Sequence, residues 1–473
     1  MAERKRVYMV AVGGVGMSAL AGLFVQAGWE VAGSDGALYP PVSDYLRDLG
    51  IRVSTPYDGE SVPRGWDLYV VGNAVTRDNP EAVRLREMGV SAESLPSALY
   101  SCFLKGKRRV VVAGTHGKTT TASMAAFALR ESGRDPSHFV GGIAEDLGGP
   151  SRLGSGEFFV VEGDEYDSAY FDKRPKFFHY RPHHLLITSV EFDHADIYRD
   201  VGEVESAFRE LVRHMPQEGT VVACVDFPLV REVVSGAPCR VVTISRRGDS
   251  DAVLVGCETG RGFVKGSFLY GGREWEVSLR VPGVHNLINA FSACLVLETA
   301  GVPLEETLPS LSRFRGVARR QMLLGEAGGV IVVDDFAHHP TAVAETIRAV
   351  REFYSPRRLV AVFEPRSNTS RRRIFEKEFV RALGEADAAV VAPPYRAERI
   401  PEEERFDPSR VAGAIKMGGK EAFSFSAREE IPPFLAEYLR EGDLVLFMSN
   451  GDFGGIQWET LRLLRDKEGK HHD

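Results

Sequence analysis

The chain has 473 residues, of which 44% are hydrophobic and 26% are charged. These proportions exclude collagen, a coiled coil or extensive disorder for most of the chain, and the length suggests about three domains. The 58 basic and 66 acidic residues give a formal net charge of −8, which argues against a protein that coats nucleic acid. The five cysteines are widely spaced, which argues against a disulfide framework or a thiolate zinc site and predicts a cytoplasmic protein.

Short apolar runs alternate with helix-like stretches along nearly the whole chain, and this pattern is typical of parallel α/β sheets. We expect buried strands at residues 7–12, 68–71, 110–113, 158–161, 185–189, 220–224, 330–333, 359–363, 388–392 and 444–448. Between residues 240 and 281 glycines separate the runs, which predicts antiparallel hairpins attached to the middle domain. Two polar segments, each followed by a new predicted strand, indicate two domain boundaries. The predicted domains are residues 1–106, 107–316 and 317–473.

A positive start followed by an uncharged stretch, residues 7–28, has the pattern of a signal peptide or a membrane anchor. Three glycines, Gly13, Gly14 and Gly16, interrupt that stretch, which then continues into a second strand. A strand, a glycine turn and a helix over residues 17–27 explain the pattern better. We therefore expect no membrane insertion.

The first glycine loop lies between a strand and a helix N-terminus, where backbone N–H groups and the helix dipole favour an anion. Asp35 ends the next strand, at about the spacing from which a carboxylate holds a ribose hydroxyl. Ala11 stands where the dinucleotide-binding pattern has a glycine. Two interpretations stay open: a close turn without a ligand, and a site for a nucleotide or nucleotide-sugar diphosphate.

A second glycine loop follows the strand at 110–113 and opens an apolar helix over residues 122–129. This is the context of a phosphate-binding loop, although only two residues separate its glycines where the common form has four. Backbone N–H groups would cradle phosphates, Lys118 would reach the β- and γ-phosphate oxygens, and Thr119 would hold Mg²⁺. The loop residues are Gly114, Thr115, His116, Gly117, Lys118, Thr119 and Thr120.

Acidic residues and a histidine follow two later strands. Glu162 ends one strand, at the point where a nucleotide-bound metal needs a ligand. Asp164 and Glu165, taken singly, are better explained as solvated loop charges. His194, beside Asp193, also ends a strand, and the ends of parallel strands share one edge of a sheet. We therefore favour a second metal site at His194 over a purely structural histidine.

A histidine and two asparagines, His285, Asn286 and Asn289, stand at the start of a helix predicted over residues 286–299. His285 or Asn286 is either a helix cap or, with its neighbours, a group that hydrogen-bonds an adenine edge. The residues alone favour neither interpretation.

Together these motifs resemble those of the Mur ligase family, ATP-dependent enzymes that form amide bonds in cell-wall precursors. The motifs stand in the family's order and cover nearly the whole chain. They are Gly114–Thr120, Glu162 with Asp164 and Glu165, Asp193–His194, His285–Ala290, Arg319–Arg320, and Asp334–Asp335 with His338–Pro340.

The resemblance implies a three-domain α/β fold. The N-terminal domain would be Rossmann-like and bind a UDP-sugar. The central domain would be P-loop ATPase-like, with a parallel sheet and a small antiparallel part, and bind ATP. The C-terminal domain would be Rossmann-like and bind an amino acid or peptide. The implied partners are ATP, UDP-N-acetylmuramate and a short peptide, and the implied cofactor is Mg²⁺.

Individual site residues follow from the same resemblance. The UDP-sugar residues are expected to be Gly13, Gly14, Val15, Gly16, Asp35 and Asn73. The ATP residues are those of the second glycine loop with His285, Asn286, Asn289, Arg320 and Asp335. The metal ligands would be Thr119, Glu162 and His194, the catalytic residues Lys118, His194 and Arg320, and the peptide residues Arg366, His338 and Ser449.

The glycine loop with His116 and the string Asp334–Pro340 resemble the branch of the family that acts on UDP-N-acetylmuramate itself. One enzyme of that branch adds L-alanine, and another adds the recycled tripeptide L-alanyl-γ-D-glutamyl-meso-diaminopimelate. Loop 13–18 resembles the alanine enzyme. We favour the tripeptide acceptor and keep L-alanine as the alternative. The strings that resemble the tripeptide enzyme are residues 72–80, 171–174, 178–180, 191–196, 363–369 and 448–451.

In the implied reaction the lactyl carboxylate attacks the γ-phosphate of ATP, and the peptide amine then displaces phosphate from the acyl phosphate. Arg366, at the end of a strand, is the candidate partner of a peptide carboxylate, because the arginine fork binds carboxylates bidentately. The run Arg371–Arg373 is better explained as a solvated helix face. An NAD-dependent oxidoreductase is a weaker alternative, because it would leave Lys118 and Glu162 without a function. A nucleotide-dependent switch and a folate polyglutamylating enzyme are two further alternatives that we favour less.

Overall fold

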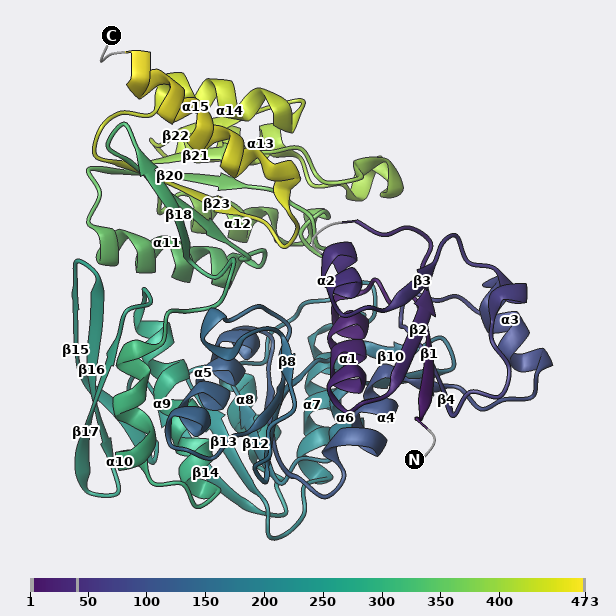
Figure 1. Cartoon of the computed structure of the whole chain (residues 1–473). Coiled ribbons are helices and arrows are strands. Elements are labelled where there is room, and N and C mark those ends of the chain that lie inside the picture. Colours follow the sequence, from purple (N-terminus) through teal and green to yellow (C-terminus); the bar gives the residue numbers. More distant parts are fainter. Residues whose placement is uncertain (1–3, 40–41, 471–473) are drawn as a thin grey trace.

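Residues 4–39 and 42–470 are described by the computed structural model, and they form three large sheets that follow one another along the chain (Figure 1). The first sheet has five parallel strands in the order β3-β2-β1-β4-β5. The predicted strand, turn and helix at the N-terminus are present, and the helix begins at Val15. The elements are β1 (Arg6–Val10), α1 (Val15–Gln26), β2 (Glu30–Ser34), α2 (Val42–Asp48), β3 (Arg52–Ser54), β4 (Leu68–Val71), α3 (Pro80–Glu87), β5 (Glu93–Ser94) and α4 (Leu95–Leu99).

The central sheet has ten strands in the order β17-β16-β15-β14-β13-β12-β6-β9-β7-β8. Its middle is parallel, and β15, β16 and β17 form an antiparallel meander. The antiparallel part therefore begins at β15 and not at residue 240, because β14 pairs in parallel with β13. The elements are β6 (Arg108–Ala113), α5 (Lys118–Glu131), β7 (Ser137–Phe139), β8 (Ser151–Arg152), β9 (Phe158–Gly163), β10 (Asp167–Ala169), β11 (Asp172–Pro175), α6 (Phe177–Tyr180), β12 (His184–Ile187), α7 (Val201–Arg213), β13 (Thr220–Cys224), α8 (Pro228–Val234), β14 (Arg240–Ser245), β15 (Ala252–Gly260), β16 (Phe263–Tyr270), β17 (Arg273–Leu279), α9 (Val284–Thr299) and α10 (Leu304–Thr307).

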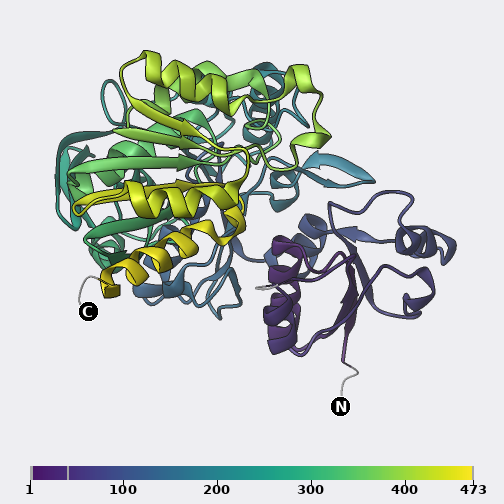
Figure 2. The ribbon, with the colours of Figure 1, turned by 90° about the horizontal axis from the view of Figure 1, so that it is seen from above.

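The C-terminal sheet has six strands in the order β18-β19-β23-β20-β21-β22, and β18 is its antiparallel member. Helices α11, α12 and α13 cover one face of this sheet, and α14 and α15 cover the other (Figure 2). The elements are β18 (Met322–Ala327), β19 (Val330–Asp335), α11 (Pro340–Tyr354), β20 (Arg358–Phe363), α12 (Glu376–Leu383), β21 (Ala388–Val391), α13 (Pro408–Met417), β22 (Glu421–Ser424), α14 (Ile431–Tyr438), β23 (Asp443–Met448) and α15 (Ile456–Lys470).

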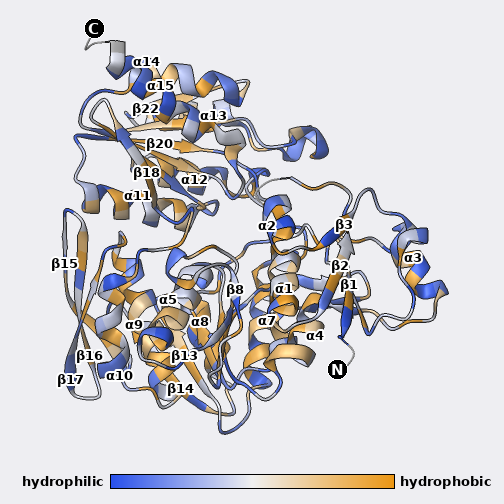
Figure 3. Cartoon of the chain, in the orientation of Figure 1, coloured by the Kyte–Doolittle hydropathy of each residue, from blue (hydrophilic) through white to orange (hydrophobic). Residues whose placement is uncertain are grey.

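The hydrophobic core of the central domain lies on both faces of its sheet. Helices α5 and α9 pack on one face and α7 and α8 on the other, and Figure 3 shows hydrophobic residues gathered on the strands and on α9. The second cluster continues into the N-terminal domain, where Leu20 and Phe24 of α1 join the cluster that contains Phe208 of α7. The N-terminal and central domains therefore share one apolar core.

The predicted three-domain α/β architecture is confirmed. Strands β9, β6 and β12 lie side by side and in parallel, so their carboxyl ends meet at one edge of the central sheet. The loops that follow these ends face the C-terminal domain, which is where parallel sheets place their sites. In the part of the chain that the structure describes, no helix combines the length and hydropathy that a membrane span needs.

Buried His138 makes the stability of the central domain depend on pH. Burial lowers the pKa of His138 in β7 to about 4, so the unfolded chain binds a proton more readily below pH 6.5. Stability is thus lost as the pH falls, and we expect this residue alone to cost about 2 kcal/mol between pH 7 and pH 5. In H138Q, urea unfolding at the two pH values should show a correspondingly smaller difference.

The matched control is S137A, in the same strand. Ser137 donates a hydrogen bond to Gly154 O at 3.3 Å but carries no titratable group. Its loss should lower the free energy of unfolding equally at both pH values. An unchanged pH dependence in H138Q would contradict the assignment.

Candidate functional site

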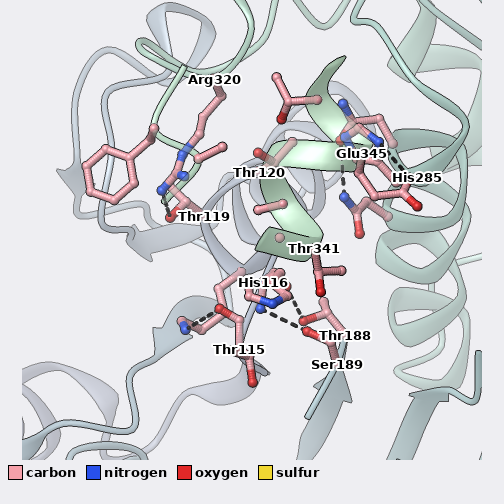
Figure 4. Close-up of a pocket in the computed structure, with 18 of the residues that line it drawn as sticks. Thr115, His116, Thr119, Thr120, Thr188, Ser189, His285, Arg320, Thr341 and Glu345 are labelled. Atoms are coloured by element: carbon pink, nitrogen blue, oxygen red, sulfur yellow. Dashed lines mark hydrogen bonds and ion pairs between the residues drawn. The ribbon is translucent and has the colours of Figure 1, made fainter. Parts of the chain in front are cut away.

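A cleft of about 270 Å³ opens between the carboxyl edge of the central sheet and the C-terminal domain. The second glycine loop and the strand ends form one wall, and β19 and α11 contribute the other. Figure 4 shows Arg320 above Thr119 and the His285–Glu345 side of the same cleft. The structure therefore brings the predicted ATP residues together from two domains. Those that line the cleft are Thr115, His116, Gly117, Lys118, Thr119, Thr120, His285, Asn286, Asn289, Arg320 and Asp335.

The second glycine loop is a tight turn beneath the end of β12. Gly114 has φ +135°, and a Cβ there would overlap Thr188 Oγ1, so the position accepts only glycine. Gly117, with φ +78°, is the N-cap of α5 and has no side chain to obstruct the helix terminus. His116 N donates to Ser189 Oγ at 2.8 Å, which fixes the loop against the strand end. The helix N-terminus is thus open to an anion.

The lysine of the loop is held by a buried carboxylate. Lys118 Nζ donates to Gly114 O at 2.6 Å and to Glu165 Oε1 at 3.0 Å. Burial lowers the pKa of Lys118, but Glu165, Asp164 and Glu162 outweigh it and raise the pKa overall. Glu165 is only 2% exposed, so its interpretation as a solvated loop charge is wrong. Its sequence position after β9 does not show this burial, which depends on His194 and Tyr198 in the segment that follows β12.

Oxygen atoms suited to a magnesium ion meet at the start of α5. Thr119 Oγ1 donates to Glu162 Oε1 at 3.0 Å, and Gly141 N donates to Glu162 Oε2 at 2.6 Å. Hydroxyl and carboxylate oxygens are the ligands that Mg²⁺ prefers. The chemistry of this pair fits a nucleotide-bound magnesium ion. Arg320 Nη2 lies 3.4 Å from Thr119 Oγ1, so the C-terminal domain reaches the same point.

His194 stands in a left-handed backbone conformation with φ +59° and uses both ring nitrogens. Nε2 lies 2.8 Å from Glu165 Oε1, and Nδ1 lies 2.8 Å from Tyr166 Oη. Burial opposes a charge on this ring, but the Glu165 hydrogen bond and charge prevail and raise the pKa of His194. Lys118 and His194 thus share one carboxylate. The predicted metal role of His194 stays a prediction.

The histidine and asparagines of α9 do not cap their helix. The helix begins at Val284, and its N-cap, Gly283, makes no side-chain bond. Asn286 Nδ2 instead donates to Pro282 O at 2.7 Å and to Gln321 Oε1 at 3.1 Å. Burial lowers the pKa of His285 to about 4. The capping interpretation is therefore wrong, and these polar groups line the far end of the cleft.

Asn289 completes that polar row, because its Nδ2 donates to Asn286 Oδ1 at 3.1 Å. Asn289 also lies against the glycine loop, where a Cβ on Gly117 would come within 3.2 Å of its Oδ1. The row therefore runs continuously from the glycine loop to Gln321, in the segment between the central and C-terminal domains.

The C-terminal domain brings a cation and a histidine to the cleft. The Arg320 guanidinium lies 4.2 Å from the centre of the Phe336 ring. Asp335 accepts hydrogen bonds from Gln321 N at 2.8 Å and from Ala337 N at 2.6 Å, which fixes the turn that carries Arg320. His338 lies 3.5 Å from Asp193 Oδ2, so this predicted peptide residue meets the loop that carries His194.

The other two predicted peptide residues lie at the ends of two paired strands, Arg366 after β20 and Ser449 after β23. Ser449 Oγ donates to Glu364 Oε2 at 2.5 Å, and Arg366 pairs with Asp452 at 2.7 Å. Burial raises the pKa of Glu364, which Ser449 and Arg366 partly offset. Arg366 and Ser449 are not among the residues that line the cleft, and they stand beside it in the C-terminal domain. Their predicted role in peptide binding therefore stays a prediction.

The run Arg371–Arg373 is not the solvated face of a helix, because α12 begins only at Glu376. Arg372 pairs with Glu404. Arg371 and Arg373 donate to backbone carbonyl groups, at Tyr395 and Arg405 respectively. The three side chains instead pack against the loops that follow β21.

The predicted UDP-sugar residues gather at the carboxyl edge of the first sheet, away from this cleft. Asp35 accepts hydrogen bonds from Gly13 N at 2.8 Å and Gly36 N at 2.7 Å, so both of its oxygens hold backbone groups. Ala11 stands in the left-handed region at φ +64°, at the position where the pattern has glycine. Asn73 follows β4, the strand beside β1.

The backbone turn before α1 is also tightly packed. Gly14 is the N-cap of α1 without a side-chain bond, and a Cβ on Gly16 would lie 3.0 Å from Leu95 Cδ1. Val15 is 59% exposed although it opens the helix. The glycine turn thus leaves an apolar side chain and the helix N-terminus open to solvent.

The sequence interpretation missed an ion pair that joins two domains at the cleft. Arg246 binds Glu345 of α11 with both guanidinium nitrogens, at 3.2 and 3.0 Å. Arg246 directly follows β14, so its place at the carboxyl end of a parallel strand was the available signal. The partner, Glu345, is far away in the sequence and could not be paired with it.

Known proteins resemble the chain along its whole length. The family descriptions "Mur ligase family, catalytic domain", "Mur ligase middle domain" and "Mur ligase, glutamate ligase domain" match residues 6–105, 112–297 and 319–451. The UDP-N-acetylmuramate–L-alanyl-γ-D-glutamyl-meso-2,6-diaminoheptandioate ligase of Escherichia coli is 35% identical, over 98% of this chain and 99% of its own.

Two L-alanine ligases also match nearly the whole chain. The UDP-N-acetylmuramate–L-alanine ligase of Kineococcus radiotolerans is 38% identical, over 99% of this chain and 98% of its own. The crystal structure of the UDP-N-acetylmuramate–alanine ligase of Thermotoga maritima matches with a TM-score of 0.80 and 27% identity, over 98% of this chain and 99% of that one. Family descriptions, relatives and cleft agree: the chain belongs to the Mur ligase family and is an ATP-dependent enzyme that forms an amide bond.

Proposed function

We propose that this Mur ligase is a murein peptide ligase, which joins the tripeptide L-alanyl-γ-D-glutamyl-meso-diaminopimelate to UDP-N-acetylmuramate. The E. coli relative named for this substrate supports the proposal. The observation that carries it is a group of arginines in the C-terminal domain, because the tripeptide brings several carboxylates and L-alanine brings only one. The reaction would return recovered peptide to peptidoglycan synthesis in the cytoplasm.

Three arginines surround Tyr395. The guanidinium groups of Arg366 and Arg396 lie 4.0 and 5.1 Å from the centre of its ring, and Arg371 donates to Tyr395 O at 3.2 Å. Burial and neighbouring arginines lower the pKa of Arg371. Among residues 4–39 and 42–470, neither Arg371 nor Arg396 forms an ion pair with a carboxylate. Such a group favours an anionic ligand.

The arginine group is connected to the cleft by a hydrogen bond between the domains. Ala195 N, next to His194, donates to Thr369 Oγ1 at 3.1 Å. Thr369 lies between Arg366 and Arg371 in the chain. A peptide whose carboxylates meet these arginines can therefore extend its amino group toward the glycine loop.

The chemistry rests on activation of a carboxylate. In the proposed reaction the lactyl carboxylate takes the γ-phosphoryl group of ATP, and ADP leaves. The peptide amine then attacks the acyl phosphate, and phosphate leaves with the new amide bond formed. Because the acyl phosphate also reacts with water, a cleft closed by two domains protects it.

Each predicted residue has a proposed part in that sequence. Lys118 would give up part of its contact with Glu165 and bind the phosphate oxygens. Thr119 and Glu162 would hold the magnesium ion that neutralises phosphate charge. His194 would bind a second ion only after it releases one of its two hydrogen bonds. The polar row from His285 to Asn289 would contact the adenine, and the first glycine loop, with Asp35 and Asn73, the UDP-sugar.

L-alanine remains the second candidate acceptor, because the Kineococcus relative and the Thermotoga structure are named for it. The two acceptors are distinguished by phosphate release from ATP with UDP-N-acetylmuramate and Mg²⁺, together with mass spectrometry of the product. We expect turnover with the tripeptide and little with L-alanine. Turnover with L-alanine alone would overturn the proposal, and turnover with neither would contradict the muramate substrate.

Arg371 should matter for the tripeptide and not for ATP. We expect R371A to raise KM for the tripeptide by about 10- to 100-fold, the effect of losing a hydrogen bond to a charged group, with KM for ATP unchanged. The matched control is R373A, because Arg373 donates to Arg405 O and lies outside the group around Tyr395. Equal effects of the two substitutions would contradict a carboxylate contact at Arg371.

Arg319 and Arg320 are neighbours with different partners, and their substitutions should separate activity from stability. Arg320 reaches the glycine loop, so R320A should lower kcat by about 100-fold or more. Arg319 pairs at 3.1 Å with Asp334, which is 2% exposed. R319A leaves that carboxylate unpaired and should lower the free energy of unfolding by about 3 kcal/mol. Steady-state kinetics and urea unfolding of both variants check this, and the reverse pattern would refute it.

A further inference from the structure

Two histidines and a glutamate meet where the glycine loop touches the C-terminal domain. His116 belongs to the loop, Glu191 follows β12, and His339 is the N-cap of α11. One ligand atom from each residue lies within 4.8 Å of those of the other two. The backbone of His116 belongs to the predicted ATP loop, but none of the three side chains takes part in the phosphate or magnesium contacts described above. The cluster is therefore a separate feature of the cleft.

In the described part of the chain, two polar atoms of this cluster face only each other and a third has no partner. His116 Nε2 and Glu191 Oε2 lie 2.9 Å apart, yet within the described residues neither atom makes a hydrogen bond of acceptable geometry. The same holds for His339 Nε2. The rings of His116 and His339 lie 4.6 Å apart at an angle of 38°. Buried polar atoms without partners cost free energy unless something else binds them.

Other contacts hold the three side chains in place. The backbone of His116 is bonded to Thr188 and Ser189 at the end of β12. Glu191 Oε1 accepts from Thr341 Oγ1 at 3.1 Å, which leaves Oε2 directed at the histidines. The donor set is thus assembled before any ligand arrives, and preorganised ligands bind metals with less ordering cost.

We propose that His116, Glu191 and His339 form a transition-metal site, suited to Zn²⁺, that joins the central domain to the C-terminal domain. Two imidazoles and one carboxylate, with a fourth position for water, are a common zinc donor set. Magnesium prefers oxygen ligands and is the weaker candidate here. The site is distinct from the Thr119–Glu162 pair, and it does not depend on which acceptor the enzyme uses.

The ring of His339 is ready to bind a cation as a neutral ligand. Burial and the nearby His116 lower the pKa of His339 to about 3, so the ring carries no charge near neutral pH. Thr341 N donates to His339 Nδ1 at 3.3 Å. Binding through Nε2 moves the ring proton to Nδ1 and gives up this long hydrogen bond, which the metal–nitrogen bond replaces.

A metal at this position would hold two domains together. Two of its ligands move with the central domain and the third moves with α11, so opening the cleft breaks at least one metal–ligand bond. Zinc should therefore stabilise the closed arrangement.

The test is binding of Co²⁺, whose visible absorption reports nitrogen and oxygen ligands, to the full chain freed of metal with a chelator. We expect one Co²⁺ per chain, displaced by Zn²⁺, and a rise in Tm with Zn²⁺. H339N keeps an N-cap but removes the imidazole. It should weaken Co²⁺ binding by at least about 100-fold. Substitution of residues that only hold the metal ligands in place already lowers metal affinity by about 10- to 100-fold.

A second variant and two controls make the result decisive. E191Q keeps an oxygen for Thr341 and removes the charge, so it should also weaken binding, and circular dichroism checks that both variants fold. H338N removes the neighbouring imidazole and should leave Co²⁺ affinity unchanged. The sequence also has two histidines near its last residue, His471 and His472, so H471N/H472N controls for ions bound there.

Two outcomes would overturn the proposal. The first is Co²⁺ affinity that is the same in wild type, H339N and E191Q. The second is loss of binding in H471N/H472N alone, which would show an adventitious ion only. Both readouts are made without ATP or acceptor, so failure here is distinct from failure of the tripeptide assignment.

Discussion

The buried carboxylate of Glu165 is the group on which the site depends. It binds the amine of Lys118 at the start of α5 and the ring of His194 beyond β12. A charge buried this deeply is tolerated only because both partners lie within hydrogen-bond distance. The glycine loop and the His194 loop are therefore fixed relative to each other. The Ala195–Thr369 hydrogen bond extends the same arrangement into the C-terminal domain.

Much of this architecture is predictable from the sequence, for physical reasons. Parallel strands buried on both faces are continuous apolar runs, so the runs at 110–113 and 359–363 identify β6 and β20. Glycines with a left-handed backbone, such as Gly117, mark the phosphate loop. Residues that end parallel strands must share one edge, which is why Glu162 and His194 could be assigned to one site.

The rest depends on contacts between segments that the sequence does not pair. Glu165 looks like a loop charge until His194 and Tyr198, from the segment after β12, pack against it. The ion pair of Arg246 with Glu345 and the meeting of His116 with His339 both cross from one domain to another. The start of the antiparallel meander was misplaced because glycine-separated strands look alike whether a neighbour runs parallel or not. Local patterns therefore specify elements and strand ends, and the packing of domains specifies partners.

The apolar core shared by the N-terminal and central domains has a consequence for how the substrates meet. Leu20 and Phe24 of α1 pack in the cluster that also contains Phe208 of α7. Separating these two domains would expose that surface to water, so they form one rigid body. The C-terminal domain meets these two domains through ion pairs such as Arg246–Glu345 and through a smaller apolar contact, because Phe353 of α11 lies in the central cluster. The second junction is therefore the easier of the two to open, and the residues proposed for the UDP-sugar lie on one side of it while those proposed for the peptide lie on the other.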